Sequence, residues 1–480
     1  MKLVAPVLRV LGFAYIALAL LLLIPLMWDL LANNPDWLAF AFSSIIIGMI
    51  GLLLSVAMGG YKIESINSRQ AFLITASAWI TIPAFGALPF LGLGVGFHNA
   101  FFESVSGFTT TGSTVLMGLD SMPPGLLLWR SLTQWIGGVG IIVMASLLLP
   151  LLRIGGMQLF RTESSDKSEK IVSRTTDLVR WVMGLYVVLT TLCTLLYHLS
   201  GMSWFDALNH ALTTLSSGGF STHDKSFAYF ESQAAVFFGI IFMIASGLPF
   251  VLMIKAVRRS PKVLLQDPQV VTFMAILLLF SMGVCIYLGL NNEVPFKEAF
   301  LESMFVVTSV VTTTGFGLGD YTNWGPLIIG VIMMLTFFGG CTGSTSGGIK
   351  TFRFIVFFGT VRANMKQMIR PDQVVVIRYG ETNVTPDLAF SVLAFLVVYL
   401  STVGIVTVVL TGFNLDLVTA LSAAATAIGN VGPGLGPIVG PAGTFADIPL
   451  GAKWVLSGAM LLGRLELFTV LILLDPEFWR

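Results

Sequence analysis

Ten stretches of this 480-residue chain are long and apolar enough to cross a lipid bilayer as helices, which constrains the fold more than any other feature. A membrane-spanning helix needs about 20 apolar residues to cross a hydrocarbon core of about 30 Å. Only 11% of the residues are charged, against about 25% in soluble domains. We therefore predict an all-α polytopic membrane protein. The ten predicted spans are residues 10–32, 37–60, 71–95, 124–151, 180–201, 233–256, 269–290, 325–358, 388–412 and 449–474.

Lysine and arginine residues cluster between the spans and predict the topology. The clusters fall at residues 2–9, 62–69, 153–180, 255–262 and 350–378, with Arg480 at the end. Because short loops rich in Lys and Arg stay in the cytoplasm, these segments and both termini are expected there. The first apolar stretch runs past Trp28 without the small-residue cleavage pattern of a signal peptide, so we expect a retained helix.

Four short apolar segments remain outside the spans. Between successive basic clusters after Arg69 the chain must cross an even number of times, yet each interval holds two long spans and one extra segment. At 12 to 14 residues these segments are too short to cross as helices, so we expect them to enter from the outer side and return. They are residues 97–108, 204–215, 299–311 and 415–428.

A polar, glycine-containing string follows each short segment. The strings read FTTTGST, TLSSGGFST, VTTTGFG and IGNVGPG, and they align without gaps on Gly112, Gly218, Gly315 and Gly432. The chain therefore repeats a unit of span, re-entrant helix, string and span four times, after an N-terminal helix pair. The predicted units are residues 1–69, 70–160, 161–262, 263–378 and 379–480.

The four strings predict a cation-binding ring. Irregular backbone at membrane depth is tolerated only where protein buries it or where it lines a water-filled path, so the strings should converge on one axis. A ring of backbone carbonyls can replace the hydration shell of a cation, and glycine permits the backbone angles that turn carbonyls inward. Close helix packing through small residues is the alternative for any one copy. The copies differ, since serines occupy the second string and Asn430 and Val431 the fourth.

The strings, in their contexts FFESVSGFTTTGST, LTTLSSGGFSTHD, VTSVVTTTGFG and AIGNVGPGLGP, resemble those of the Trk/Ktr/HKT superfamily of cation transporters. The two extra N-terminal helices make the chain most similar to the TrkH members, over essentially its whole length. The resemblance implies potassium uptake across the bacterial inner membrane through a single-chain pore, usually within a homodimer. It also implies a cytoplasmic nucleotide-binding ring of the TrkA type as partner. The chain itself is expected to bind no cofactor and no nucleic acid.

Carried over to this sequence, the resemblance makes the four strings a potassium selectivity filter. In the superfamily, serine in place of the first filter glycine accompanies sodium transport, so the intact Gly112 favours potassium. The predicted potassium-binding residues are Thr110, Thr111, Gly112, Ser216, Ser217, Gly218, Thr313, Thr314, Gly315, Asn430, Val431 and Gly432.

The eighth span is interrupted by FGGCTGSTSGG, which cannot form a stable lipid-facing helix because five of its eleven residues are glycines. Three interpretations are open. Gly339, Gly343 and Gly347 could form a helix-packing face. The run from Gly343 to Thr351 is one insertion away from a phosphate-binding P-loop, but its lysine is displaced and an apolar helix precedes it. We favour a flexible loop over residues 339–350 that blocks the path below the strings, because it matches the intramembrane gating loop of the resembled family.

Arg464 lies about midway along the last predicted span, where an unpaired arginine costs at least about 2.5–3.5 kcal/mol. Glu466, two residues on, faces another side of a helix and is not its expected partner. Snorkelling to the cytoplasmic surface is the alternative. In the resembled family a matching arginine contacts the gating loop, so we assign Arg464 as an electrostatic barrier. The predicted gate residues are Gly340, Gly343, Ser344, Thr345, Ser346, Gly347, Gly348, Lys350 and Arg464.

Catalysis has little support in the sequence. The four histidines lack metal-ligand spacing, and no HExxH or GxSxG motif occurs, so a membrane-embedded enzyme is the weaker alternative. A sodium- or proton-coupled carrier on the same scaffold stays open, because no motif displays coupling. Glu103 and Asp206 are expected near the starts of re-entrant helices, either as caps or as cation attractors at the mouth.

Overall fold

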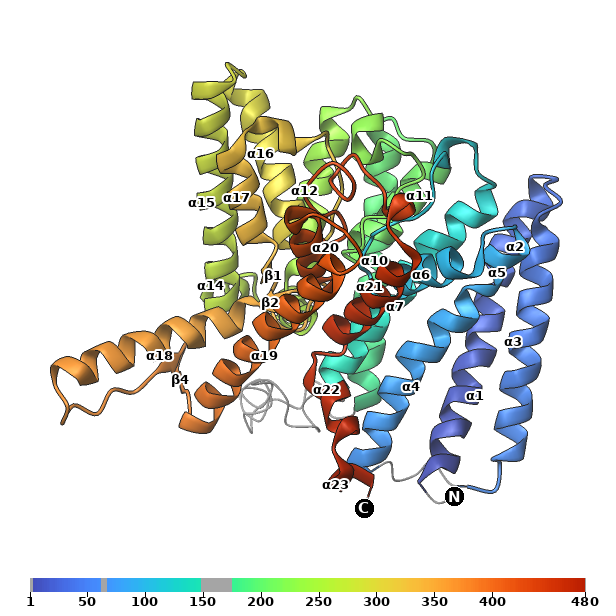
Figure 1. The fold of residues 1–480 in the computed structure, drawn as a ribbon, viewed down its shortest axis with the longest axis horizontal. Coiled ribbons are helices and arrows are strands. Elements are labelled where there is room, and N and C mark those ends of the chain that lie inside the picture. Colours follow the sequence, from blue (N-terminus) through green and yellow to red (C-terminus); the bar gives the residue numbers. More distant parts are fainter. Residues whose placement is uncertain (1–2, 62–66, 148–174, 480) are drawn as a thin grey trace.

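The computed structural model describes residues 3–61, 67–147 and 175–479. Within these ranges the chain is mainly helical, as predicted, with two short strand pairs. Seven of the described helices are long and apolar enough to span a bilayer, and two sharply bent helix pairs would bring the number to nine. The start of α1 (Val4–Leu21) and α23 (Pro476–Trp479) lie at the same end of the molecule (Figure 1). Residues 153–174 of the predicted basic segment 153–180 lie outside the described residues.

The N-terminal helices form a pair at one side of the molecule (Figure 1). Helix α1 continues into α2 (Leu23–Leu31) and packs closely along α3 (Trp37–Ala57). The buried carboxylate of Asp29 in α2 accepts a hydrogen bond from the Gly125 N–H at 2.8 Å. This N–H lies in the first turn of α7 (Pro124–Leu147), whose orphan donors need such partners. The pair is thereby attached to the first repeat.

The remaining helices repeat a pattern of long helix, short helix and second helix. The long helices are α4 (Ser68–Gly86) with α5 (Leu88–Gly92), α10 (Thr175–Leu199), α15 (Pro268–Asn291) and α19 (Pro386–Thr411). The short helices are α6 (Phe97–Phe108), α11 (Trp204–Leu215), α16 (Phe296–Val311) and α20 (Leu417–Gly429). The second helices are α7, α12 (Gln233–Gly247), α17 (Pro326–Leu335) and α21 (Leu450–Arg464). Helices α6 and α11 have the predicted bounds, and the other two differ by a few residues.

The short helices are surrounded by the longer ones. In α16 every residue from Ser303 to Val311 is buried, and in α20 every residue from Ser422 to Gly429. A helix that is buried all round lies in the interior of a large protein. Each short helix is followed by its string and then by a short 3-10 helix. These are η1 (Leu119–Ser121), η2 (Ser226–Tyr229), η3 (Tyr321–Trp324) and η4 (Phe445–Asp447). The strings therefore lie in the centre of the fold.

Two predicted spans, residues 233–256 and 449–474, are not continuous helices. Helix α12 and α13 (Phe250–Arg258) meet at 101°, because Pro249 lacks an N–H and keeps Leu248 in an extended conformation. Helix α21 and the segment formed by α22 (Phe468–Leu471) and η5 (Ile472–Leu474) meet at 102°. Arg464 is therefore the last residue of α21, and it lies at the bend in the predicted span 449–474.

The eighth span is broken as predicted. Helix α17 has only ten residues, and the chain leaves helical structure before β1 (Phe338–Gly339). Strand β1 pairs in parallel with β2 (Ile349–Lys350), which closes residues 340–348 into a loop. Helix α18 (Thr351–Ile369) then begins.

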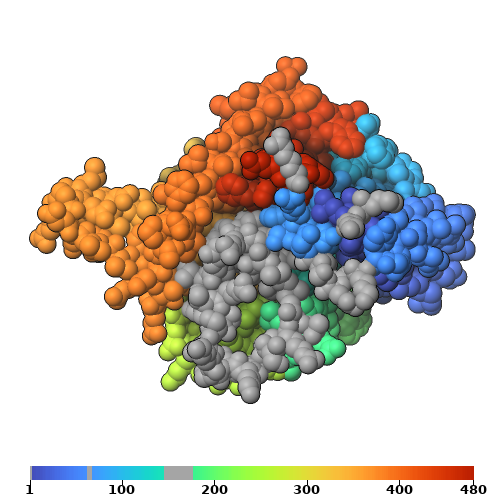
Figure 2. All heavy atoms as spheres, turned by 90° about the horizontal axis from the view of Figure 1, so that it is seen from below, coloured from blue at the N-terminus to red at the C-terminus, as the bar shows by residue number. Residues whose placement is uncertain are grey.

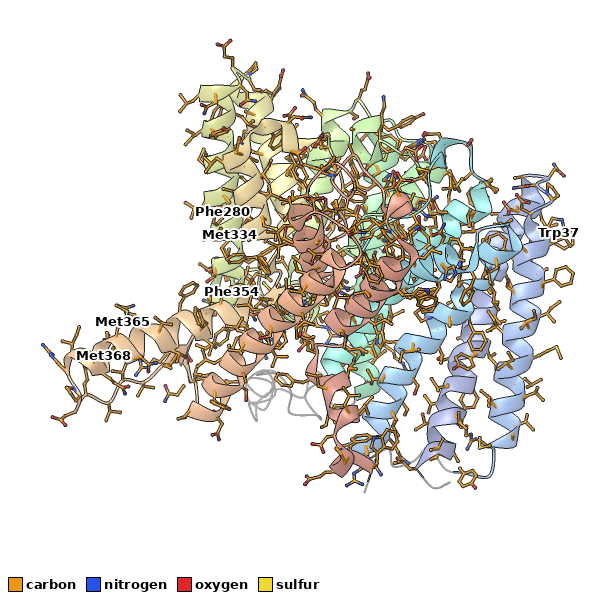
Figure 3. All side chains as sticks on the ribbon, in the orientation of Figure 1. Trp37, Phe280, Met334, Phe354, Met365 and Met368 are labelled. Atoms are coloured by element: carbon orange, nitrogen blue, oxygen red, sulfur yellow. The ribbon has the colours of Figure 1, made fainter. Side chains whose placement is uncertain are left out.

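Helix α18 stands out from the body of the protein, as the view from below shows (Figure 2). Met365 and Met368 lie near its outer end (Figure 3). The antiparallel strands β3 (Arg378–Tyr379) and β4 (Thr382–Asn383) lead from it back to α19. Helix α14 (Lys262–Gln266) connects α13 to α15.

Candidate functional site

The four strings meet in a closed circle. Gly112, Gly219, Gly315 and Gly432 all have positive φ angles, between 74° and 105°. A Cβ atom on each of them would overlap with a backbone carbonyl oxygen of the next string. The Gly218 oxygen lies against Gly112, and the Thr314 oxygen lies against Gly219. The Val431 oxygen lies against Gly315, and the Thr111 oxygen lies against Gly432. Only glycine fits these four positions, because a side chain would meet both an unfavourable conformation and a neighbouring backbone.

The second string has a different register from the predicted one. We call Gly112, Gly219, Gly315 and Gly432 the ring glycines. In each string the residue two positions before the ring glycine has a left-handed conformation, and these residues are Thr110, Ser217, Thr313 and Asn430. The next residue donates its N–H to a carbonyl five residues back in the short helix, as in Thr111 to Ser106 and Gly218 to Thr213. This bond pattern is that of a Schellman motif at a helix C-terminus. The gap-free alignment on Gly218 is therefore wrong by one residue, and the ring glycine is Gly219.

The correction moves one predicted residue away from the ring. Ser216 is the C-cap of α11, as Thr109 and Thr312 are the C-caps of α6 and α16. The other eleven predicted filter residues lie in the four strings at the ring. Two adjacent glycines made the register ambiguous in the sequence, because either of them can adopt a positive φ angle.

The side chains of the strings mainly hold one another. The hydroxyls of Thr109 and Thr111 are 2.7 Å apart, and those of Thr312 and Thr314 are 2.8 Å apart. Asn430 Nδ2 donates to Thr111 Oγ1 at 2.9 Å, which joins the fourth string to the first. The ring itself consists of neutral backbone oxygens, and no carboxylate belongs to any of the four strings. Such a ring suits a monovalent cation that has lost its water.

A buried ion pair, which the sequence analysis missed, supports the first two strings. Arg130 Nε donates to Glu103 Oε1 at 2.8 Å, and both side chains are almost fully buried. Glu103 also accepts the Val115 N–H, whereas Arg130 Nη1 donates to the Ser221 carbonyl. Glu103 is therefore neither a cap nor a mouth residue, because it lies in the middle of α6 and accepts from Thr114 Oγ1 and from the Val115 N–H at the end of the first string. The signal in the sequence was Arg130 itself, a charged residue inside a predicted span, as Arg464 is.

Asp206 does belong to a helix cap, as one of the two expectations for it had it. Its N–H donates to the Ser203 hydroxyl at the start of α11.

The loop 340–348 lies directly against the strings. Thr345 Oγ1 is 2.8 Å from Ser217 Oγ, and Gly347 N donates to Thr313 Oγ1 at 2.6 Å. Gly348 N donates to the Gly429 carbonyl at 2.7 Å. The loop therefore contacts the second, third and fourth short helices at the ends where their strings begin. Residues 344–346 of the loop are buried.

A break in α12 provides the other support for the loop. Thr345 Oγ1 donates to the Ser246 carbonyl at 3.1 Å, and Cys341 N donates to the Gly247 carbonyl at 2.9 Å. These carbonyls are free because α12 ends there. The sharp bend before α13 thus creates part of the docking surface for the loop.

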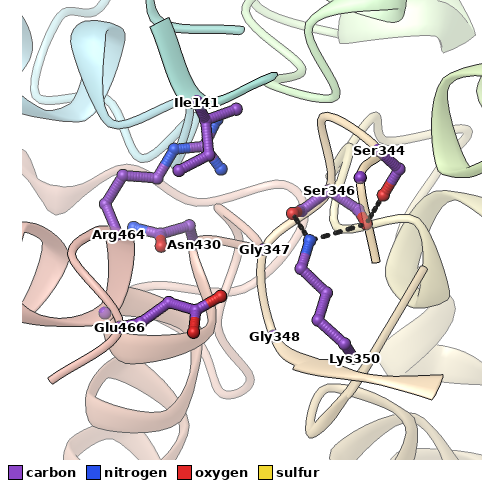
Figure 4. Close-up of a pocket in the computed structure, with 11 residues that line it drawn as sticks. Ile141, Ser344, Ser346, Gly347, Gly348, Lys350, Asn430, Arg464 and Glu466 are labelled. Carbon is purple, nitrogen blue, oxygen red and sulfur yellow. Dashed lines mark hydrogen bonds between the residues drawn. The ribbon is translucent and has the colours of Figure 1, made fainter. Parts of the chain in front are cut away.

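The loop and Arg464 enclose a small cavity (Figure 4). Its volume of about 30 Å³ is enough for one or two water molecules. Lys350 extends into it from one side and donates to the Ser346 carbonyl, while Arg464 lies on the opposite side. Asn430 of the fourth string also lines the cavity. Two cationic side chains therefore flank the space next to the strings.

Arg464 has no carboxylate partner among the described residues. It is 2% exposed, and Nη1 donates to the Thr345 carbonyl at 3.1 Å. Its Nε and Nη2 atoms have no hydrogen-bond partner in the described part of the chain. Glu466 instead pairs with Arg353 of α18 at 2.5 Å. Glu466 does not pair with Arg464, as expected. The reason differs from the expected one, because α21 ends at Arg464 and the two side chains do not lie on different faces of one helix.

Comparisons with known proteins agree over the whole chain. The family model described as TrkH, cation transport protein, matches residues 41–479. The Trk system potassium uptake protein TrkI of Halomonas elongata is 43% identical, over 99% of this chain and 97% of the relative. The protein TrkH of Escherichia coli strain K12 is 35% identical over 98% of both chains. The crystal structure of the potassium transporter TrkH from Vibrio parahaemolyticus superposes with a TM-score of 0.91 at 31% identity, over 99% of both chains.

Proposed function

Because the chain belongs to the TrkH family of cation transport proteins, we propose that it takes up potassium across the bacterial inner membrane through the ring of four strings. A member of this family is a transporter and not an enzyme. The observation that carries the proposal is the closed circle in which each ring glycine lies against a carbonyl oxygen of the next string. This arrangement lets neutral oxygens from four repeats replace the water around one cation.

The potassium-binding residues are proposed to be those of the corrected strings. The second string contributes Ser217, Gly218 and Gly219, and Ser216 has a supporting role as a helix cap. The C-terminal ends of the four short helices point their carbonyl groups toward the ring, where partial negative charge favours a cation. The remaining proposed residues are Thr110, Thr111, Gly112, Thr313, Thr314, Gly315, Asn430, Val431 and Gly432.

The loop 340–348 is proposed to be the gate, with Arg464 as an electrostatic barrier. The support is that the loop bonds three of the four strings and that Lys350 and Arg464 flank the adjacent cavity. An arginine without a carboxylate partner repels cations strongly in a buried site, where the effective dielectric constant is low. Cation flow then requires that the loop and Arg464 move apart from the strings.

The orientation of the chain in the membrane and its assembly with other subunits are part of the same proposal. Both ends of the chain are assigned to the cytoplasm, because the basic clusters follow the positive-inside rule. The exposed arm α18 carries Arg362 and Lys366, and Arg370 follows its last residue. These basic side chains suit an acidic surface of a cytoplasmic nucleotide-binding ring of the TrkA type. The transporter is proposed to be a homodimer, and any nucleotide acts through the partner ring.

Ion flux in liposomes tests the filter. Wild-type protein is expected to carry potassium in preference to sodium and lithium, down its gradient and without a sodium or proton gradient. Gly315→Ser should reduce this preference, because a side chain there overlaps with the Val431 carbonyl. Gly184→Ser is the control, since nothing lies within 4 Å of a Cβ on Gly184. Absent wild-type flux, or a Gly315→Ser variant with unchanged selectivity, would refute the filter assignment.

A further inference from the structure

The position just before each ring glycine is held in a different way in the second string. This position is occupied by Thr111, Gly218, Thr314 and Val431 in chain order. In the first and third strings its threonine hydroxyl bonds the threonine two residues earlier, at 2.7 and 2.8 Å. In the second string Gly218 has no side chain that could do this, and a second glycine follows it. Two successive glycines leave this string with the greatest backbone freedom of the four.

Gln134 of α7 occupies the place of the missing side chain. A Cβ atom on Gly218 would lie 2.6 to 2.9 Å from the three terminal atoms of the Gln134 amide. Gln134 Nε2 donates to the Gly218 carbonyl at 2.8 Å, and Gln134 Oε1 accepts the Phe220 N–H at 3.0 Å. One fully buried side chain therefore clamps the backbone on both sides of Gly219.

The two bonds determine the orientation of the amide and the direction of a ring carbonyl. Only Nε2 can donate to the Gly218 oxygen, and only Oε1 can accept from Phe220. A carbonyl oxygen has two lone pairs, so Gly218 can accept from Gln134 and still present a lone pair to a cation. The Gly218 oxygen is also the one that lies against Gly112 of the first string. The direction of this carbonyl thus affects the closure of the whole ring.

The position of the second string as a whole does not depend on Gln134. Arg130, one turn earlier on α7, donates to the Ser221 carbonyl, and its guanidinium lies 4.1 Å from the centre of the Phe220 ring. The backbone bonds at the end of α11 are also independent of Gln134. A change at Gln134 should therefore alter the Gly218 peptide locally and leave the string in place.

We propose that Gln134 is a positioning residue that sets ion selectivity, by holding the Gly218 carbonyl where the first and third strings use a threonine of their own. This rests on the proposed function of the ring. A free Gly218 peptide can rotate and adapt its oxygen to a smaller cation, which reduces the preference for potassium over sodium.

The test uses the full-length protein in liposomes. Gln134→Leu keeps the size of the side chain and removes both hydrogen bonds. Its potassium-to-sodium flux ratio is expected to fall about tenfold, the effect of losing roughly one hydrogen bond of net stabilisation. Gln134→Met also has a side chain of similar length, has no N–H or O–H donor, and should show a similar fall. Ser131→Ala is the matched control on the same helix, because the Ser131 hydroxyl bonds the Leu127 carbonyl of its own helix and no string among the described residues.

The decisive variant combines Gln134→Ala with Gly218→Thr. Gly218 has no positive φ angle, so a threonine is allowed there, and Gln134→Ala removes the atoms that it would meet. The Ser216 hydroxyl stands where Thr109 and Thr312 stand in the other strings, and it can bond the new threonine. We expect the double variant to recover most of the wild-type flux ratio, while Gln134→Ala alone does not.

The outcomes separate this inference from the proposed function. Wild-type protein without potassium selectivity would overturn the proposed function and this inference with it. Selective wild-type protein whose ratio is unchanged in Gln134→Leu or Gln134→Met would overturn the role of Gln134 alone. If Gln134→Leu does not fold, Gln134→Met and the double variant decide, and a double variant no better than Gln134→Ala would contradict the inference.

Discussion

At the scale of single residues, the strings use backbone conformations that L-amino acids disfavour. Thr110, Ser217, Thr313 and Asn430 have φ angles between 52° and 59°. A left-handed conformation costs about 1–2 kcal/mol for a residue with a side chain, and glycine is the usual residue at this position of a helix end. Three of these four side chains bond the loop or a neighbouring string. The contacts explain why a side chain is present despite the cost.

Substitution of the two adjacent glycines tests the corrected register. Gly219→Ala is expected to reduce potassium flux as strongly as Gly112→Ala, because both place a Cβ at positive φ against a ring carbonyl. It should also lower the thermal stability, by at least about 1–2 kcal/mol of conformational strain. Gly184→Ala serves as the control for both flux and melting temperature. If Gly219→Ala behaves like that control, Gly219 is not the ring glycine.

At the scale of elements, the loop is positioned by helices that stop early. The ends of α12 and α17 leave backbone groups unpaired, and the loop supplies partners for the carbonyls of Ser246 and Gly247. In the turn after α21, Glu466 and Leu467 have positive φ angles, although neither of them is a glycine. The Glu466 pair with Arg353 and the Arg464 bond to Thr345 are what hold this turn.

Two threonines of the loop form a matched pair for testing the gate. Thr345→Val removes a buried hydroxyl that contacts Ser217 and the Ser246 carbonyl, and each such bond contributes about 1 kcal/mol. We expect a several-fold rise in basal potassium flux. Thr342→Val is the control, because the Thr342 hydroxyl has no partner among the described residues. Equal flux in the two variants, or reduced flux in Thr345→Val, would count against the loop as a gate.

The outer ends of the first two strings are joined by an ionic cluster. His223 Nδ1 lies 2.5 Å from Asp120 Oδ1 of η1, and His223 Nε2 lies 3.3 Å from Asp206 Oδ1. Burial lowers the pKa of His223, but its hydrogen bonds and charge interactions with Asp206 and Asp120 outweigh burial, so the pKa is raised above 6.5. Asp224 caps the Gly118 and Leu119 N–H groups beside the cluster, and the Tyr229 ring stacks on His223.

This cluster predicts a pH-dependent stability. A raised pKa in the folded state means that the stabilisation is fully present below about pH 6.5 and is lost as the pH rises through the folded pKa. The melting temperature of wild type should therefore exceed that of His223→Gln at pH 5.5 to 6, and the difference should shrink toward pH 9. His98→Gln is the control, since His98 bonds Trp454 outside the cluster. A wild-type advantage that stays constant over this range would contradict the prediction.

At the scale of the whole molecule, α18 is the surface that most needs a partner. Its outer half exposes Met365, Met368 and Ile369, with exposed fractions of 60%, 84% and 78%. The arm extends beyond the body that contains the strings (Figure 2). The proposed homodimer accounts for this surface if the arm of one protomer packs against the other, while each chain keeps its own ring.

A change in the arm tests the proposed homodimer separately from transport. The combined variant Met368→Glu and Ile369→Glu should be monomeric, because charges in an apolar interface lack partners and the burial of each apolar side chain contributes about 1.5–3 kcal/mol. Val257→Glu, at a residue that is 80% exposed on α13, is the control. Light scattering of purified protein gives the mass, and flux per chain should stay close to wild type. A dimeric arm variant would place the interface elsewhere.

Much of the architecture followed from the sequence, because long apolar spans, short apolar segments and glycine-centred strings are local patterns. The bounds of α6 and α11, the interruption after α17 and the convergence of the strings were all predicted from such patterns. Lipid cannot satisfy a backbone donor or acceptor, so hydropathy and charge alone determine which segments cross and which return.

Only the tertiary structure decided the features that depend on contacts between distant segments. Whether Gly218 or Gly219 takes the ring position depends on which one lies against the Thr314 carbonyl, and nothing in Ser-Ser-Gly-Gly encodes that neighbour. The end of α21 at Arg464 depends on Thr345 and Arg353, and the role of Gln134 on a string more than eighty residues away. The sequence by itself determined the membrane fold and its four strings, whereas three-dimensional packing decided their register, their supports and their contacts with the loop 340–348, because hydrogen bonds between remote residues leave no periodic trace in the chain.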